Sequence, residues 1–551
     1  MNGRKHISLP LLLLGACLVF LVIAPLATVF VKALIINDHL DFSFAAAALS
    51  EPQNARMIRN SLLLGLAVVI LSSLISIPLA YLFSRTQLGR HKIFDLLFLV
   101  PFMTPPYIAS MGWILFMQKR GLFSQLVPAF PNGIPLFFTF GGLVLVMSLH
   151  IFPFMMVLMK NAMLHIPSSL EEAAAISGAG YGRRLRKIFF PLLTGNYVIG
   201  ALLVFVKTLS EYGTPYTLGR RIGFDVFTTD IHRYAAVAPI DFGKAAVLAS
   251  VLVTICMVLW LVQNYITIHH SYDLISGKGS RMKIHQLSLP GEVLATLYIG
   301  LVLVVSIGIP YFSVISTSLI RLRGFGLAAG NFTFHHYVEL FTDSETALPA
   351  IGNSFLLGLM SATICALLGT IIVLTIRSSR SRSGKVLEAM SLLPEMLPGI
   401  VLVIGLMLFW NDIYDILPLY NTMGIMVITY TALFLPYTVQ YVTSASTQLS
   451  ESLLEAGRVF GGSRYYIFRH ITCPLIARGM AAGWMMTFII AIRELVAPSL
   501  IAPPDTLVIS TYIVREFEQG SVSLGMSMAV LCILLTTLSL TAVKLLTRKL
   551  K

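Results

Sequence analysis

Long apolar segments alternate with short polar segments along almost the whole of this 551-residue chain. A run of about 18 or more apolar residues is long enough to cross the hydrocarbon core of a bilayer as a helix. The chain contains about twelve such runs, so the sequence predicts an all-α polytopic membrane protein with about 12 transmembrane helices. Their expected limits are 9–35, 61–84, 94–117, 136–160, 191–212, 243–267, 293–318, 354–376, 387–410, 423–446, 475–498 and 524–546. The first run is too long for the core of a signal peptide and is expected to remain as a membrane anchor.

Composition supports this interpretation, because 56% of the residues are hydrophobic and only 12% are charged. Excess Lys and Arg marks the loops of a membrane protein that face the cytoplasm. If the N terminus is inside and the runs alternate, the inner segments hold most of the 39 basic residues but few of the 25 acidic ones. Both termini are therefore expected in the cytoplasm. The basic inner loops account for the net charge of +14, so this charge does not indicate a nucleic-acid partner, and none is expected.

The chain is similar to itself over two halves. Corresponding residues are 293 positions apart at the start of the repeat and 283 positions apart from Pro153 onward. The first half therefore holds ten extra residues, which are expected near Gln118–Pro135. The matched pairs are Asn60/Asn353, Ser61/Ser354, Asp95/Glu388, Pro101/Pro394, Pro105/Pro398, Pro153/Pro436, Gly200/Gly483, Glu211/Glu494 and Pro215/Pro498.

Each half is expected to contain six spans in the same orientation, which makes a parallel repeat related by an axis along the membrane normal. The first half comprises residues 1–268 and the second half residues 291–551. The stretch 269–290 between them is polar and rich in Ser, Gly and basic residues, and it is expected to be a cytoplasmic linker. The interface between the two halves is expected to form the pathway for a solute.

One polar, basic loop occurs twice, after the fourth span of each half, at about 165–191 and about 448–474. Its front part is expected to be a short helix that begins near Ser168 or Ser450, since serine is a favourable N-cap residue. Small residues open one face of this helix to close approach, and a glycine permits a sharp turn after it. The motif residues are Glu172, Ala173, Ala174 and Gly178 in the first copy and Glu455, Ala456 and Gly461 in the second. An ordinary basic loop is the alternative, but two copies at matched spacing favour a docking site that is used twice.

The doubled motif resembles the EAA loop of the membrane subunits of binding-protein-dependent ABC importers. Each half resembles one six-span permease of the type I, MetI-like class, and the resemblance covers nearly the whole chain. It implies that each loop is a coupling helix held in a cleft of a cytoplasmic ATPase subunit. The glutamates would pair with basic groups on the ATPase, the alanines would form the close-packed face, and the glycines would form the turn. The corresponding residues are Glu172, Ala173, Ala174 and Gly178, and then Glu455, Ala456 and Gly461.

The second copy departs from the family pattern. Gly457 stands at the third position of the motif, and Cys473 replaces the usual Leu before Pro474. A looser second contact is therefore expected.

The chain lacks a G-x-x-x-x-G-K-[ST] phosphate loop, because Gly384-Lys385 has neither the upstream glycine nor the following hydroxyl. It is therefore not expected to be an enzyme or to hold a cofactor. ATP would be bound and hydrolysed by two copies of the partner ATPase.

The resemblance also implies a periplasmic or lipid-anchored substrate-binding protein as a partner, and a place among the lipids of the bacterial inner membrane. The fusion of both halves, with the segments SEYGTPYTLG and IRELVAPSLIAPPDTLVIS after the fifth span of each, looks most like ferric iron permeases. Thiamine, polyamine and phosphonate permeases are alternatives. A secondary transporter driven by an ion gradient is a more distant alternative, since it would not need the matched loops.

Ionisable residues inside spans are costly and are therefore candidates for the pathway. Lys207 and Glu211 lie in the outer part of span five with the i,i+4 spacing of an ion pair. Arg493 and Glu494 occupy the matching place in span eleven, and Glu395 lies at a proline bend in span nine. A locked ion pair and a simple helix kink are the alternative interpretations. The spans contain no cluster of His, Cys and carboxylates with metal-ligand spacing, so no metal site is expected.

Overall fold

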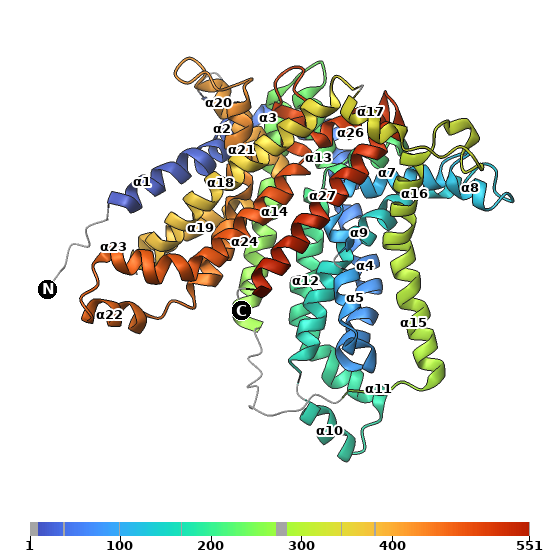
Figure 1. Ribbon diagram of the computed structural model, residues 1–551, viewed down its shortest axis with the longest axis horizontal. Helices are drawn as coiled ribbons and strands as arrows, with labels where there is room; N and C mark the ends of the chain where they lie inside the picture. The colour runs from blue at the N-terminus through green and yellow to red at the C-terminus, as the bar shows by residue number, and fades with distance from the viewer. Residues whose placement is uncertain are drawn as a thin grey trace. The chain divides into compact units, whose positions relative to one another are not determined.

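The structure, a computed structural model, describes residues 9–36, 39–98, 100–166, 168–270, 284–342, 344–379 and 382–549 (Figure 1). These residues are mostly helical, and their one sheet is the hairpin of β1 (Ile35–Ile36) and β2 (His39–Leu40). Ten of the described helices are long and apolar enough to cross a membrane, or eleven if one bent pair counts as a span. The predicted all-α membrane fold is confirmed.

The helices of the first half are α1 (Leu9–Leu18), α2 (Ala24–Leu34), α3 (Phe42–Ser50), α4 (Pro52–Arg85), α5 (Lys92–Leu97), α6 (Val100–Met103), α7 (Pro106–Met117), α8 (Leu122–Leu126), α9 (Phe140–Leu164), α10 (Ser168–Ile176), α11 (Tyr181–Arg184), α12 (Phe190–Ser210), α13 (Phe227–Ala236) and α14 (Phe242–His270). Those of the second half are α15 (Leu289–Leu303), α16 (Ile309–Leu319), α17 (His335–Thr342), α18 (Ala347–Ser379), α19 (Arg382–Met396), α20 (Gly399–Asp412), α21 (Met423–Ser446), α22 (Glu451–Val459), α23 (Arg464–Ile467), α24 (Cys473–Ile492), α25 (Val496–Ile501), α26 (Ile509–Glu518) and α27 (Val522–Lys549).

Short irregular helical turns join several of these elements. The π-helical turns are η1 (Val19–Ile23), η4 (Leu185–Phe189), η5 (Pro215–Gly219), η7 (Val304–Gly308) and η9 (Phe468–Thr472). The 3₁₀ turns are η2 (Gln87–Arg90), η3 (Pro135–Phe137), η6 (Arg220–Ile222) and η8 (Arg323–Phe325). Four of the π-helical turns form two pairs at corresponding positions of the repeat, η1 with η7 and η4 with η9.

Prolines interrupt the third span of each half. In the second half α19 and α20 meet at an angle of 109°, and Pro398 precedes α20 in an extended conformation. In the first half Pro105 takes the same conformation before α7, and the segment before it is divided into α5 and α6. Proline lacks a backbone donor and keeps the preceding residue out of the helical region. The bend expected in span nine is confirmed, and the expected twelve spans become ten or eleven because these two segments are broken.

The ten extra residues of the first half lie where the repeat places them. The loop after α7 contains α8 and the turn η3, whereas no helical element lies between α20 and α21. This difference falls within the loop that was expected to carry the insertion.

Packing divides the chain into two compact units that differ from the two sequence halves. One unit comprises Met1–Ser50, Ile231–Val253 and Thr333–Lys551, and the other comprises Glu51–Asp230 and Thr254–Phe332, as far as these ranges are described. Each unit contains the same group of three mutually packed helices. In one unit these are α4, α9 and α12, and in the other they are α18, α21 and α24 (Figure 1).

The first helix of each half packs within the unit formed mainly by the opposite half. Helix α16 packs on α7, and helix α2 packs on α20. At both crossings a glycine packs closely against the backbone carbonyl of a proline on the other helix. A Cβ on Gly112 would lie 2.7 Å from the carbonyl oxygen of Pro310, and a Cβ on Gly405 would lie 2.6 Å from that of Pro25. Gly112 and Gly405 are 293 positions apart, so the crossing is itself part of the repeat.

We predict that Gly112→Ala and Gly405→Ala each destabilise the protein by about 1 to 3 kcal/mol, the usual cost of adding a carbon atom to a tightly packed contact. The new Cβ would meet a backbone oxygen, which cannot turn away as a side chain can. Thermal unfolding of the purified chain, followed by size-exclusion chromatography, measures the change.

The matched control for this test is Gly300→Ala in α15, where nothing lies within 4 Å of the new Cβ. Alanine has the higher helix propensity, so this variant is expected to be neutral or slightly stabilised. Equal melting temperatures for Gly112→Ala and Gly300→Ala would show that the glycine crossing does not limit stability.

Candidate coupling loops and pathway residues

The two repeated loops form the short helices that the motif predicts. Helix α22 begins after Ser450, whose Oγ accepts a hydrogen bond from the backbone N–H of Leu453 at 3.3 Å. Both helices end at a glycine in the left-handed region, Gly178 with φ +78° and Gly461 with φ +80°. Residues with a Cβ rarely adopt this conformation, so the sharp turns predicted at these glycines are confirmed.

The same backbone hydrogen bond closes both turns. The N–H of Ala179 donates to the carbonyl oxygen of Ala174 at 2.9 Å, and the N–H of Gly462 donates to that of Gly457 at 2.9 Å. This six-residue closure is the hydrogen bond of a Schellman motif, which satisfies a carbonyl at the end of a helix. The two coupling loops therefore share one backbone geometry.

The two coupling helices expose the motif side chains and a large apolar residue at matched positions. Glu172 and Glu455 are both exposed. Ile176 is 88% exposed and Val459, its counterpart 283 positions later, is 83% exposed. Exposed apolar side chains grouped on one surface element mark an interaction site. In α22 the surface is enlarged by Phe460, which is 90% exposed.

The third motif position of the second copy, Gly457, lies against two isoleucine side chains. A Cβ on Gly457 would lie 2.9 Å from Cδ1 of Ile471 and 3.3 Å from Cγ1 of Ile467. The corresponding residues of the first copy are Ile188 and Arg184. An alanine at position 457 would therefore require the end of the Ile471 side chain to shift. Whether the second docking contact is looser stays a prediction.

A similar sequence of elements leads from each loop into the next span. Helix α11 is followed by the π turn η4 and then by α12, and helix α23 is followed by η9 and then by α24. Pro191 and Pro474 lie near the start of α12 and α24, but the continuous helices that contain them begin earlier and run Gly182–Ser210 and Tyr465–Ile492. Each proline therefore lies inside a long helix, directly after a π-helical turn, and the prediction that these prolines open the spans is wrong.

Glu211 accepts hydrogen bonds just beyond the end of α12, and its carboxylate caps the next helical turn. The N–H of Thr214 donates to Oε2 of Glu211 at 3.0 Å. The backbone carbonyl of Glu211 accepts from Oγ1 of Thr228 at 2.8 Å. Close by, Ser61 Oγ accepts from the N–H of Phe227 at 2.9 Å, and Asn60 Nδ2 donates to the carbonyl of Asp225 at 3.3 Å.

The second half repeats this network. The carboxylate of Glu494 accepts from the N–H groups of Val496 at 2.9 Å and of Ala497, the counterpart of Thr214, at 3.3 Å, and its backbone carbonyl accepts from Ser510 Oγ. Ser354 Oγ accepts from the N–H of Ile509 at 2.8 Å, and Asn353 Nδ2 donates to the carbonyl of Leu507 at 2.9 Å. The sequence repeat identified the Asn-Ser and Glu pairs separately, but it gave no reason to connect them. In each unit they hold the start of the second span of a half against the segment that follows its fifth span.

The remaining pathway candidates have local partners of their own. Nζ of Lys207 lies 5.9 Å from the ring centroid of Phe154, which is within reach of a cation–π contact. Glu395 lies just before the break between α19 and α20 and accepts a hydrogen bond from Gln440. Lys207 and Glu211 belong to one compact unit, while Glu395, Arg493 and Glu494 belong to the other. The ion pair of Lys207 with Glu211, and the role of all five in a pathway, stay predictions.

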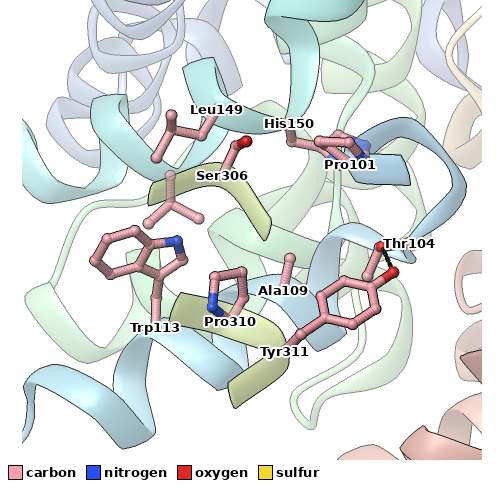
Figure 2. Close-up of a pocket in the computed structure, with 10 residues that line it drawn as sticks. Pro101, Thr104, Ala109, Trp113, Leu149, His150, Ser306, Pro310 and Tyr311 are labelled. Atoms are coloured by element: carbon pink, nitrogen blue, oxygen red, sulfur yellow. Dashed lines mark hydrogen bonds between the residues drawn. The ribbon is translucent and has the colours of Figure 1, made fainter. Parts of the chain in front are cut away.

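A small cavity lies near the crossing of α7 and α16 (Figure 2). Its lining includes Trp113, His150, Ser306 and Tyr311, and the hydroxyls of Thr104 and Tyr311 are 2.6 Å apart beside it. Its volume of about 10 Å³ has room for about one water molecule. A larger groove of about 700 Å³ in the same unit is lined almost entirely by apolar side chains of α4, α12 and α15. None of the pathway candidates lines either cavity.

Among the residues that the structure describes, no three His, Cys, Asp or Glu side chains are grouped so that they could hold a metal ion.

Two segments of the chain, residues 77–267 and 356–551, each match the family described as "Binding-protein-dependent transport system inner membrane component". Together they cover more than half of the chain, and each lies in one half of the repeat. The chain is 25% identical over 529 residues to the ferric transport system permease protein FbpB of Actinobacillus pleuropneumoniae, which is 94% of this chain and 75% of that protein.

Two further relatives bear on the assignment. The chain is 26% identical over 530 residues to the putative ferric transport system permease protein FbpB 1 of Haemophilus influenzae, which is 93% of this chain and 80% of that protein. It is 27% identical over 212 residues to the molybdenum transport system permease protein ModB of Escherichia coli, which is 38% of this chain and 92% of that protein. This chain thus belongs to the family of binding-protein-dependent transport system inner membrane components, as a multi-pass permease subunit of an ABC importer with two MetI-like repeats.

Proposed function

We propose that this permease imports ferric iron, delivered by a periplasmic or lipid-anchored binding protein and driven by two copies of a cytoplasmic ATPase. The two copies dock on α10 and α22, one on each coupling helix. Both termini, the linker 269–290 and both loops face the cytoplasm, in agreement with the charge distribution along the chain. The ATPase subunits bind the ATP, and this chain forms the path of the cargo.

The observation that carries the docking proposal is the matched exposure of the two coupling helices. Each presents an acidic motif residue and a large apolar side chain, Glu172 with Ile176 and Glu455 with Val459. Each helix ends in the same glycine turn, which fixes the direction of the chain beyond it. The two loops thus present the same kinds of side chain at matched positions of a parallel repeat. Two such surfaces suit two copies of one partner.

The iron proposal rests on the relatives that span nearly the whole chain. Three of them carry names of ferric transport permeases, at 23 to 26% identity over at least 90% of this chain. The sulfate and molybdenum permeases match less than half of the chain. An importer that takes its cargo from a carrier protein does not need a strong metal site of its own.

We predict that Ile176→Ser together with Val459→Ser weakens ATPase binding about tenfold, because large apolar side chains at the centre of an interface supply much of its binding energy. The ratio of ATPase to permease after affinity purification of the full chain measures binding. The control is Ile416→Ser, which changes an 80% exposed isoleucine in the loop after α20. A purified ratio that is the same for the double variant and the control would contradict docking at these residues.

Changing both motif glutamates is expected to remove the ATPase as well. The double variant Glu172→Ala with Glu455→Ala should retain less than about a tenth of the ATPase, since each change leaves a basic group of the partner unpaired. Each single variant should keep the contact on the unchanged loop. Glu518→Ala, at the exposed glutamate that ends α26, is the control. If the double variant still holds the ATPase and transports normally, the glutamates have no role in docking.

Deleting the chain from its host is expected to abolish uptake of ⁵⁵Fe(III) at low iron concentrations and to leave uptake of labelled thiamine, polyamines and phosphonates unchanged. If the deletion abolishes uptake of thiamine, a polyamine or a phosphonate and leaves iron uptake unchanged, that solute is the cargo and the iron proposal is wrong.

Iron uptake in vesicles should require ATP and should persist when the proton gradient is collapsed. Uptake that needs only the proton gradient would instead indicate a secondary transporter.

A further inference from the structure

An arginine joins each repeated loop to the end of a neighbouring span. Arg85 is the last residue of α4, and its Nη2 donates to the backbone carbonyls of Met163 at 2.8 Å and Ile166 at 3.0 Å. These carbonyls belong to the end of α9 and to the residues just after it, directly before the coupling helix α10.

The second half contains the same arrangement. Arg377, near the end of α18, donates through both terminal nitrogens to the backbone carbonyls of Ser446 and Leu449. Ser446 and Leu449 follow Met163 and Ile166 by 283 positions each, which is the spacing of the coupling motif. Each arginine therefore binds the corresponding two carbonyls of its own half.

The contact has a clear physical basis. The last carbonyls of a helix have no partner inside the helix, and a cation placed there is favoured. Arg85 is only 1% exposed, and a buried charge without hydrogen-bond partners is strongly unfavourable. Both N–H groups of Nη2 are used, one for each carbonyl. One side chain thus connects the end of α4 to two carbonyls at the entrance of the loop.

Arg85 also contacts the segment that follows the coupling loop, just before α12. Cζ of Arg85 lies 5.4 Å from the ring centroid of Phe189, the last residue of η4 before α12. In the second half the residue at this position is Thr472, which offers no ring, and Arg377 is only partly buried. Arg85 thus contacts both flanks of its loop, while Arg377 holds one.

The spans that carry these arginines also form side-chain hydrogen bonds near their other end. Asn60 and Ser61, near the start of α4, bind the segment after span five, and Asn353 and Ser354 do the same in α18. Helix α4 has 34 residues and α18 has 33, so each is about 50 Å long at 1.5 Å per residue. Each half therefore has one long helix fixed to the coupling loop at one end and to the candidate pathway segment at the other.

We propose that Arg85 and Arg377 are positioning residues that transmit movement of the coupling helices to α4 and α18, and so link ATP hydrolysis to transport. The inference rests on the proposed docking of an ATPase at α10 and α22. Without the arginine, the coupling helix would still fold and dock, because the hydrogen bond that closes its glycine turn is local. Its movement would no longer carry the long helix with it.

The first test compares ATP hydrolysis with transport in the full complex of this chain and its ATPase, reconstituted in liposomes with the iron-loaded binding protein. In Arg85→Met, ATPase binding and basal hydrolysis should be retained, while iron transported per ATP should fall about tenfold, within the usual range of coupling energies. Arg377→Met should lose less, because its link lacks the aromatic contact. Arg85→Lys should lie between Arg85→Met and the unchanged chain.

The control is Arg90→Met, which removes an exposed arginine from the turn η2 just after α4. It should leave transport per ATP unchanged. An unchanged ratio in both Arg85→Met and Arg377→Met would overturn the inference. If Arg85→Met does not yield folded protein, Arg85→Lys and Arg377→Met decide the question. An unmodified chain that binds no ATPase would instead refute the proposed function.

A second readout does not depend on the cargo. Spin labels at His91→Cys and Gly182→Cys, both exposed positions on either side of the Arg85 link, report the distance between the end of α4 and the coupling loop. The five native cysteines are replaced by alanine for this experiment. The unchanged link should give a narrow distance distribution, and Arg85→Met should broaden it. Equal distributions would show that Arg85 does not hold the loop to α4.

Discussion

Backbone polar groups at helix ends need hydrogen-bond partners where water is scarce, and the repeated hydrogen bonds of Arg85, Arg377, Glu211 and Glu494 supply such partners. A helix leaves its first N–H groups and its last carbonyls unpaired, and a membrane span cannot leave them in lipid. Arg85 and Arg377 satisfy carbonyls after the fourth span of each half. Glu211 and Glu494 accept from the N–H groups that begin the short helical segment after the fifth span. The places where helices stop are thus the places where one helix is fixed to another.

This constraint also explains the contrast between rigid and exposed parts of the chain. The ends of α4 and α18 are tied through side chains to segments far away in the sequence. The coupling helices α10 and α22, in contrast, are completed by local hydrogen bonds and expose their apolar side chains. A helix that needs only local contacts to fold can present a whole face to a partner. A helix fixed at both ends can carry a displacement along its length.

Much of this fold follows from the sequence, because a membrane span and a repeat both leave strong local patterns. The helix and turn of each repeated loop were predictable from a glutamate and a glycine at matched spacing, and the left-handed glycines confirm the turns. The break in the third span was predictable at the prolines of the second half but not in the first half, where the apolar run is continuous and Pro105 precedes α7. The packing of α16 on α7 could not be predicted, because an apolar helix does not encode which apolar helix it will meet. Arg85 and Arg377 were missed as a pair because they are 292 positions apart, one residue out of the register of the flanking matches.

The two halves keep their helix-end contacts, including those of Glu211 and Glu494, and differ at the other pathway candidates. Phe154 of the first half corresponds to Tyr437 of the second, and Lys207 corresponds to Ile490. Glu395 and its partner Gln440 fall in the second half alone. A contact that fixes a helix end has to be made in both halves, because each half has the same ends to satisfy. A side chain that completes no helix end is not constrained in this way, so it can differ between the two halves while the helix-end contacts stay the same.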